Sequence, residues 1–314
     1  KLTDIGQLSS EVSKTAGLLW LGAALLFIII AILLLTGQEW WWIPAIPILL
    51  LSQALIISTW QDAKFGTIAN LIILLAMIVG FSLWNFNFQT NREKESILAA
   101  SNQLSETVTS SMLEDLPIPV QKWLNYSGVV GKKQVNTVSL KQEGLMKLEP
   151  GQKQWMKSEA NQTFTIDKPA FIWQVRTSMF GLPVVGRDIF QEGQGAMQIK
   201  LAGLLPVVNI ANQAKLNEST MQRFLGEIVW FPQAALSPCI KWEYIDDNSA
   251  KATMEYRGTK GSAVFHFDNQ GVPVKFTAFR YRDIEDHEPT EWIAEIKEVT
   301  NTNGINIPTA LEAS

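Results

Sequence analysis

Residues 219–230 read STMQRFLGEIVW, and this segment decides how the second half of the chain folds. Its apolar side chains recur at the i, i+3, i+4, i+7 and i+8 spacing of one helix face: Met221, Phe224, Leu225, Ile228 and Val229. Ser219 and Gln222 have the spacing of a capping box at the start of this helix, and Pro232 ends it. A helix with one apolar face buries that face against another apolar surface, so a partner layer is required.

The sequence on both sides of this helix alternates with a period of two, which predicts strands. Upstream, Phe171, Trp173 and Val175 share one face. Downstream, the same alternation predicts strands over four stretches: 250–256, 263–267, 272–278 and 292–296. The third stretch is expected to place four side chains on its apolar face: Val272, Val274, Phe276 and Ala278. Clusters of Asp, Asn and Gly separate the stretches, so antiparallel pairing through short turns is expected.

We therefore expect an α+β fold in which a curved antiparallel sheet, an open half-barrel, is covered on its concave face by the helix of 220–230. This β-rich extramembrane domain is predicted to span 116–314 and to include a short helix at 120–124. Before it, residues 91–115 carry apolar side chains at helical spacing and are expected to form a helical linker or stalk. Pro117 and Pro119 end that helix.

The first ninety residues are of a different kind, because they hold only seven charged side chains: Lys1, Asp4, Glu11, Lys14, Glu39, Asp62 and Lys64. Three uncharged stretches, 17–35, 40–60 and 66–86, are each long enough to cross a hydrocarbon core of roughly 30 Å as a helix. Tryptophans gather near the ends of these stretches, as in the aromatic belt of a membrane interface: Trp20, Trp40, Trp41, Trp42, Trp60 and Trp84. Residues 1–90 are predicted to be a membrane domain with three transmembrane helices.

The distribution of lysine and arginine predicts the orientation. Lys1, Lys14 and Lys64 fall on one side of the predicted membrane, whereas Arg92 and Lys94 fall on the other. The positive-inside rule then predicts a cytoplasmic residue 1, and an extracytoplasmic domain on a multi-pass protein of the cytoplasmic membrane. Because the chain opens at Lys1 rather than at a methionine, we also expect a segment upstream of it.

The predicted spans contain no ionisable side chain, which favours an anchor over a transporter. Two polar residues lie within them, Gln53 in the second and Asn70 in the third. Amide side chains inside a helix bundle commonly hydrogen bond to a neighbouring helix, so a contact of this kind is predicted for both.

Several kinds of function are excluded or lack support. A net charge of −4 argues against a nucleic-acid partner, and the single cysteine, Cys239, excludes an intrachain disulfide and any paired-cysteine metal site. His266 is interpreted as part of a solvated strand face, and His287 as part of an exposed turn. The motifs of serine hydrolases, zinc proteases and nucleotide-binding loops do not occur, so no catalytic residue, metal or cofactor is predicted.

Charged side chains at the rim of the predicted apolar face are the candidates for a binding site. Arg280 and Arg282 continue the face of 272–278, and Arg223 and Glu227 are one helical turn apart. The predicted ligand-binding set combines these charges with aromatic residues of the inner face: Trp173, Arg187, Asp188, Arg223, Glu227, Trp230, Phe276, Arg280, Arg282 and Trp292. The alternative interpretation is a set of ion pairs that fixes the helix on the sheet.

Three motifs together resemble a bacterial family that is known only as a domain of unknown function: Leu116-Pro117-Ile118-Pro119-Val120-Gln121, then Gly186-Arg187-Asp188-Ile189-Phe190 with Gly193 and Gly195, and Trp230-Phe231-Pro232. The turn at 60–67 resembles one between membrane helices of longer members. The resemblance covers nearly the whole chain and implies an integral membrane protein with one extramembrane domain and, in longer members, a helix before residue 1. It brings no established activity. The layout also resembles the open half-barrels of lipoprotein carriers, which hold acyl chains between a curved sheet and a helical lid.

Three classes of function stay open. The aromatic inner face and the membrane tether favour binding of an apolar or amphipathic ligand such as membrane lipid. A structural or assembly subunit would instead contact a membrane-protein partner. An envelope enzyme would use Asp188, Glu218 or Glu227 as acid or base. A cavity would favour the first class, a filled sheet interior the second, and two carboxylates converging in a cleft the third.

Overall fold

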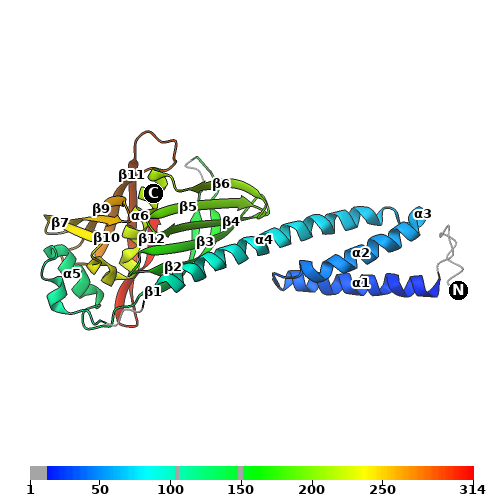
Figure 1. Ribbon diagram of the computed structural model, residues 1–314, viewed down its shortest axis with the longest axis horizontal. Coiled ribbons are helices and arrows are strands. Elements are labelled where there is room, and N and C mark those ends of the chain that lie inside the picture. Colours follow the sequence, from blue (N-terminus) through cyan, green and yellow to red (C-terminus); the bar gives the residue numbers. More distant parts are fainter. Residues whose placement is uncertain (1–12, 103–105, 148–150) are drawn as a thin grey trace. The chain divides into compact units, whose positions relative to one another are not determined.

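The computed structural model describes residues 13–102, 106–147 and 151–314. The chain forms two compact units, one of Lys1–Gln89 with Leu201–Leu205 and the other of Thr90–Lys200 with Pro206–Ser314. Apolar helices make up the first unit, whereas the second contains antiparallel sheets that do not close into a barrel (Figure 1). The predicted α+β class is confirmed.

The first unit contains α1 (Lys14–Leu35), α2 (Trp42–Ser58), α3 (Trp60–Ala63) and most of α4 (Gly66–Ala100). Two of these helices, α1 and α4, are long and apolar enough to cross a membrane, and α2 is a shorter apolar helix of 17 residues. α1 begins before the predicted residue 17 because the Ser13 hydroxyl accepts a hydrogen bond from the Ala16 N–H and caps the helix.

The polar residues of the first unit hydrogen bond between α2 and α4. The Asn70 amide donates to Gln53 Oε1 at 2.9 Å, and the Ser52 hydroxyl donates to Asn70 Oδ1 at 3.1 Å. Gln53 also donates to the Thr67 hydroxyl. The predicted interhelical contact of Gln53 and Asn70 is therefore confirmed.

α4 continues without a break to Ala100. The sequence predicts instead that one helix ends at residue 86 and that another begins after residue 91. The change of hydropathy near Gln89 suggested a boundary, but this stretch contains no glycine or proline to break the helix. The predicted linker includes residues 103–105, which lie outside the described residues. A turn of 3₁₀ helix, η1 (Ser110–Leu113), and then α5 (Ile118–Ser127) follow, and α5 confirms the short helix predicted at 120–124.

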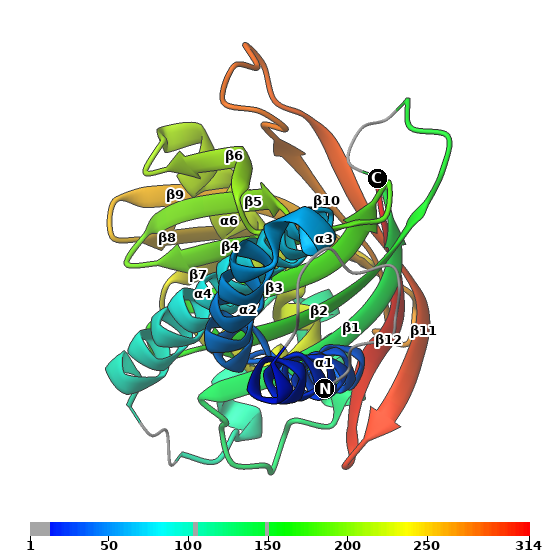
Figure 2. The same ribbon diagram turned by 90° about the vertical axis from the view of Figure 1, so that its right-hand side faces the viewer.

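In the described part of the chain, twelve strands form two six-stranded antiparallel sheets, each a meander in chain order (Figure 2). The first sheet contains β1 (Thr137–Met146), β2 (Met156–Thr165), β3 (Ala170–Met179), β4 (Leu182–Gln191), β5 (Gln194–Leu201) and β6 (Leu205–Ala211). The second contains β7 (Ile240–Asp246), β8 (Ser249–Tyr256), β9 (Thr259–Phe267), β10 (Pro273–Arg280), β11 (Thr290–Thr302) and β12 (Ile305–Ala313). The expected curved sheet is thus divided in two, because a helical segment separates β6 from β7.

That segment contains α6 (Ala214–Glu227) and two short 3₁₀ helices, η2 (Ile228–Trp230) and η3 (Pro232–Leu236). α6 contacts β4 of the first sheet and β8, β9 and β10 of the second. Its predicted apolar face is buried, since Met221, Phe224 and Leu225 are almost completely inaccessible. The core of the second unit is built around this face.

Aromatic rings fill the space between α6 and the sheets. Phe164 lies at the centre of one group, with ring centroids of Phe231, Phe171 and Phe224 at 4.6, 6.0 and 6.3 Å. Phe265 lies at the centre of another and contacts the rings of Trp123, Trp242, Phe267 and Phe276. Burial of this apolar area is the main favourable term for folding of the second unit.

The predicted capping box is wrong, because α6 begins at Ala214, five residues before Ser219. Ser219 lies inside the helix and donates its hydroxyl hydrogen to the Tyr281 carbonyl. The Gln222 amide donates to the carbonyls of Ser262 and Phe279. Both side chains therefore join the helix to the second sheet instead of capping it.

The predicted apolar face of β10 holds for Phe276 and Ala278 but not for Val274, which is 40% exposed. The pairing of β10 with β9 shifts between Pro273 and Lys275. Such a bulge inserts an extra residue and reverses the alternation on one side of it. Val274 consequently points away from the core.

Candidate functional site

A row of registered residues crosses the concave face of the first sheet. Leu140 of β1 pairs with Gln162 of β2, Gln162 with Trp173 of β3, and Trp173 with Asp188 of β4. Because antiparallel partners point to the same face, these side chains form a continuous strip beneath α6. The strip carries two polar groups, Gln162 and Asp188, that are almost completely buried.

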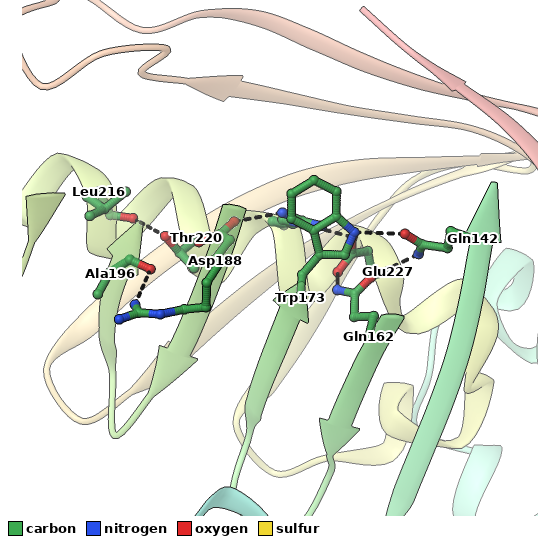
Figure 3. A network of polar contacts seen from close by, with 10 residues as sticks. Gln142, Gln162, Trp173, Asp188, Ala196, Leu216, Thr220 and Glu227 are labelled. Carbon is green, nitrogen blue, oxygen red and sulfur yellow. Dashed lines mark hydrogen bonds and ion pairs between the residues drawn. The ribbon is translucent and has the colours of Figure 1, made fainter. Parts of the chain in front are cut away.

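Arg223 of α6 lies between two carboxylates above this strip. Its Nη1 is 2.7 Å from Asp188 Oδ2, and its Nε is 2.9 Å from Glu227 Oε1. The side chains of Arg223, Asp188 and Glu227 are 16%, 5% and 12% exposed. Figure 3 shows Asp188 and Glu227 with their partners. These ion pairs are shielded from solvent, so removal of one partner would leave a buried charge.

Glu227 is also the start of a chain of hydrogen bonds that leads to Trp173 (Figure 3). Gln162 donates to Glu227 Oε2 at 2.7 Å, Gln142 donates to Gln162 Oε1 at 2.9 Å, and the Trp173 indole N–H donates to Gln142 Oε1 at 2.8 Å. The Arg223 guanidinium lies over the Trp173 ring at 4.6 Å. Trp173 therefore contacts both ends of the network.

Burial and ion pairing shift the pKa values of Glu227 and Arg223 in opposite directions. Burial raises the pKa of the Glu227 carboxyl above its usual range, although the Arg223 guanidinium acts against this shift. Burial also lowers the pKa of the Arg223 guanidinium, but Glu227 and Asp188 outweigh it, and the pKa lies above its usual value. Arg223 therefore keeps its proton, and Glu227 takes up a proton more readily than an ordinary glutamate does.

Arg280 of β10 joins the site from the second sheet. Burial, with the nearby Arg223 guanidinium, lowers its pKa to about 10. Its guanidinium lies over the half-buried Trp292 ring at 4.6 Å, and its buried Nε–H has no hydrogen-bond partner among the described residues. Asp188 Oδ1 is likewise buried and lacks a partner in the described part of the chain. Two unsatisfied polar groups, one from each sheet, thus lie in one region.

The structure brings together Asp188, Arg223, Glu227, Arg280 and the rings of Trp173 and Trp292. Phe276 and Trp230 belong to the adjoining core, where Phe276 contacts Trp292 and Trp230 contacts Phe164. The prediction that Arg187 and Arg282 join them is not supported. Arg187 points to the other face of β4 and pairs with Glu93 of α4 at 2.9 Å, and Arg282 is exposed in the loop after β10.

Gln142 and Gln162 belong to the network but were missed from the sequence. Glutamine in a strand usually marks a solvated face, and no hydrophobic signal distinguishes these two. Gln162 could have been found, because it precedes the buried Phe164 by two residues and therefore shares its face.

The family assignment rests on residues 106–314, which contain this site and both sheets. They match the family of unknown function DUF6544. The chain belongs to this family. No curated protein and no solved structure matches it. The resemblance to a domain of unknown function is confirmed for residues 106–314.

Other candidates in the DUF6544 domain lie apart from the network. Glu218 and Cys239 line a surface hollow of about 640 Å³, together with lysines and glutamates of β7, β8 and β9. Among the described residues, no group of three His, Cys, Asp or Glu side chains is placed to hold a metal ion. His287 is exposed, as expected for a turn.

His266 is half-buried on β9, where its ring contacts the hydroxyls of Ser249 and Thr277. Burial lowers its pKa below the usual value, and Lys275 acts in the same direction, whereas Asp246 opposes it. The unfolded chain therefore binds a proton first as the pH falls, so the folded DUF6544 domain loses stability below about pH 6.5. We expect His266→Asn to reduce this loss.

The measurement is the unfolding temperature of the full chain in neutral detergent between about pH 5 and 8. His287→Asn is the control, because that ring is exposed and should leave the pH dependence unchanged. An unchanged pH dependence in His266→Asn would contradict the prediction.

Proposed function

We propose that the DUF6544 domain binds an amphipathic molecule with an anionic head group, while the apolar helices hold it at the membrane. The head group accepts hydrogen bonds from Arg280, and the apolar chain lies against the rings of Trp173 and Trp292. One observation carries the proposal: the Arg280 Nε–H is buried and has no hydrogen-bond partner among the described residues. Guanidinium groups bind carboxylate and phosphate oxygens well, and unsatisfied donors in a protein interior are uncommon.

The charge of the site supports an anionic partner that binds together with a proton. Arg223 pairs with Asp188 and Glu227, so this set of three carries one negative charge when Glu227 is ionised. Arg280 balances that charge. An anion bound to Arg280 would raise the pKa of Glu227 further, because like charges repel in a region of low dielectric. We therefore expect binding to tighten as the pH falls and Glu227 becomes protonated.

Photolabelling tests the proposed function. The full chain in neutral detergent is irradiated with a diazirine analogue of a fatty acid, and the labelled peptides are identified by mass spectrometry. Labelling is expected on peptides that contain Trp173 or Trp292 and should increase at lower pH. Arg280→Ala should reduce it by about tenfold, the equivalent of one charge-assisted hydrogen bond.

Arg282→Ala is the matched control, because this arginine is exposed two residues further along the chain. It should retain wild-type labelling. Equal labelling in Arg280→Ala and the wild type, or no labelling at these peptides, would contradict the proposal.

The filled interior supports a second candidate, a structural or assembly subunit. Phe164, Phe171, Phe224 and Phe231 are packed ring against ring, and the ion pairs of Arg223 fix α6 on the first sheet. In this account the DUF6544 domain is a rigid module that contacts a membrane-protein partner. The enzyme class has less support, because both converging carboxylates, Asp188 and Glu227, are bound by Arg223.

The anchor is proposed to consist of three spans, α1, α2 and α4, in the cytoplasmic membrane of a bacterium, with the DUF6544 domain outside the cytoplasm. α2 is short, but 17 residues give a length of about 26 Å, which is close to the hydrocarbon thickness. The proposed orientation rests on Lys1, Lys14 and Lys64, which the positive-inside rule places on the cytoplasmic side.

Cysteine labelling in intact cells tests this orientation. In a Cys239→Ser background, we expect Gln38→Cys and Gln270→Cys to react with a membrane-impermeant maleimide, whereas Gln61→Cys should react only after lysis. All three positions are exposed in the structure. Protection of Gln270→Cys in intact cells would place the domain in the cytoplasm.

A further inference from the structure

The two ends of the first sheet differ in the kind of side chain that they expose. In a meander, alternate turns lie at the same end, so the β1–β2 and β3–β4 turns lie together, opposite the β2–β3 and β4–β5 turns. The first end carries four exposed apolar side chains, which we call the tip fringe: Leu145 (60%), Trp155 (57%), Phe180 (96%) and Leu182 (47%). The turns at the other end carry Asp167, Lys168 and Glu192.

Phe180 occupies a position where an aromatic residue is unfavourable for the turn itself. The β3–β4 turn consists of Phe180 and Gly181, with φ of 52° and 79°. Two-residue turns of this kind favour Asn or Asp before the Gly, and bulky residues rarely adopt positive φ. Within the part of the chain that the structure describes, the Phe180 ring is 96% exposed, so it is available to a partner outside the chain.

Contacts within the second unit give the direction in which β3 runs along the charged end of α4. Within the second unit, Ile97 packs on Ile172, and Glu93 pairs with Arg187, which is the register partner of Gln174. Four residues backward along α4 therefore correspond to two residues forward along β3. Phe180 lies six residues beyond Gln174, or about 20 Å in an extended strand.

α4 itself changes from charged to apolar side chains close to Glu93. Phe88, the last apolar residue before the charged stretch, precedes Glu93 by five residues, or about 7.5 Å of helix. The β5–β6 turn, at the same end of the sheet as the tip fringe, supplies Leu201–Leu205, which are grouped with the apolar helices in the first unit.

From these exposed apolar side chains we infer that the tip fringe inserts into the surface of a lipid bilayer. Exposed Lys153 and Lys157 flank the fringe, and the Lys147 ammonium lies over the Trp155 ring at 4.4 Å. Aromatic rings bordered by lysine are typical of segments at the interface with anionic lipids. The inference does not depend on a ligand in the concave site.

Spin labelling of the full chain tests this inference. In a Cys239→Ser background, Phe180→Cys is labelled with a nitroxide and reconstituted into vesicles of phosphatidylcholine and phosphatidylglycerol. Collision rates are measured with oxygen, which concentrates in the bilayer, and with a water-soluble nickel complex. We expect the label at 180 to collide more with oxygen, and several-fold less with nickel, than a label at Glu192→Cys.

Glu192→Cys is a matched control, because Glu192 and Gly193 form the same kind of turn, with φ of 52° and 77°, at the opposite end of the sheet. Trp155→Cys on the neighbouring hairpin should behave like Phe180→Cys. Equal nickel collisions at 180 and 192 would show that the fringe lies in water. Low collisions with both reagents would show that protein, such as a second copy of the chain, covers it. Either result would overturn the inference.

Discussion

Replacing Arg223 by alanine is expected to lower the free energy of unfolding of the DUF6544 domain by about 3–5 kcal/mol, because Asp188 and Glu227 would both lose the guanidinium with which they form ion pairs. Arg223 also contacts the Trp173 ring of the first sheet. For a domain of this size, such a loss lowers the unfolding temperature by roughly 10 °C. Near-ultraviolet circular dichroism of the full chain in neutral detergent measures this change in the unfolding temperature.

The triple variant Arg223→Met, Asp188→Asn, Glu227→Gln separates two contributions to this loss of stability, the unpaired charges and the lost packing. It removes all three charges and keeps similar volumes, so we expect most of the stability to return. A loss in the triple variant as large as that in Arg223→Ala would show that the guanidinium acts through packing alone. No loss in Arg223→Ala would contradict the described ion pairs.

Phe164→Ala is expected to lower the free energy of unfolding by a similar amount, about 3–5 kcal/mol, because it opens a cavity where four other rings meet. The same change at Phe279 of β10 is the control, because that ring is 64% exposed. It should alter stability by less than about 0.5 kcal/mol. The unfolding temperatures of the two variants in neutral detergent make the comparison, and equal values would contradict a filled core around Phe164.

The sequence predicted the elements that local periodicity encodes. The spacing of Met221, Phe224 and Leu225 predicted a buried helix face, and alternation predicted β8 and β9. Two features depend on information that local patterns lack. The division into two sheets depends on long-range strand pairing, and the bulge at Pro273 depends on how β10 meets β9. The continuity of α4 is not predicted either, because the fall in hydropathy after Phe88 resembles the end of a membrane helix although the helix continues.

Part of the candidate site was predictable for the same reason. Arg223 and Glu227 are one helical turn apart, so their ion pair follows from helix geometry. Adjacent strand residues point to opposite faces, so Arg187 and Asp188 could not both line one site. The exposure of Arg282 was not predictable, because it depends on where β10 ends. The buried Nε–H of Arg280, which lacks a partner among the described residues, could only be found once both sheets were in place.

Native mass spectrometry of the full chain tests the central claim most directly, that Arg280 holds the anionic head group of an amphipathic molecule. The chain is extracted in neutral detergent, and the masses of wild type, Arg280→Ala and Arg282→Ala are compared. The proposal predicts a co-purifying anionic amphiphile on wild type and Arg282→Ala, and its loss from Arg280→Ala. Absence of any bound molecule from the wild type, or equal retention by all three proteins, would contradict it.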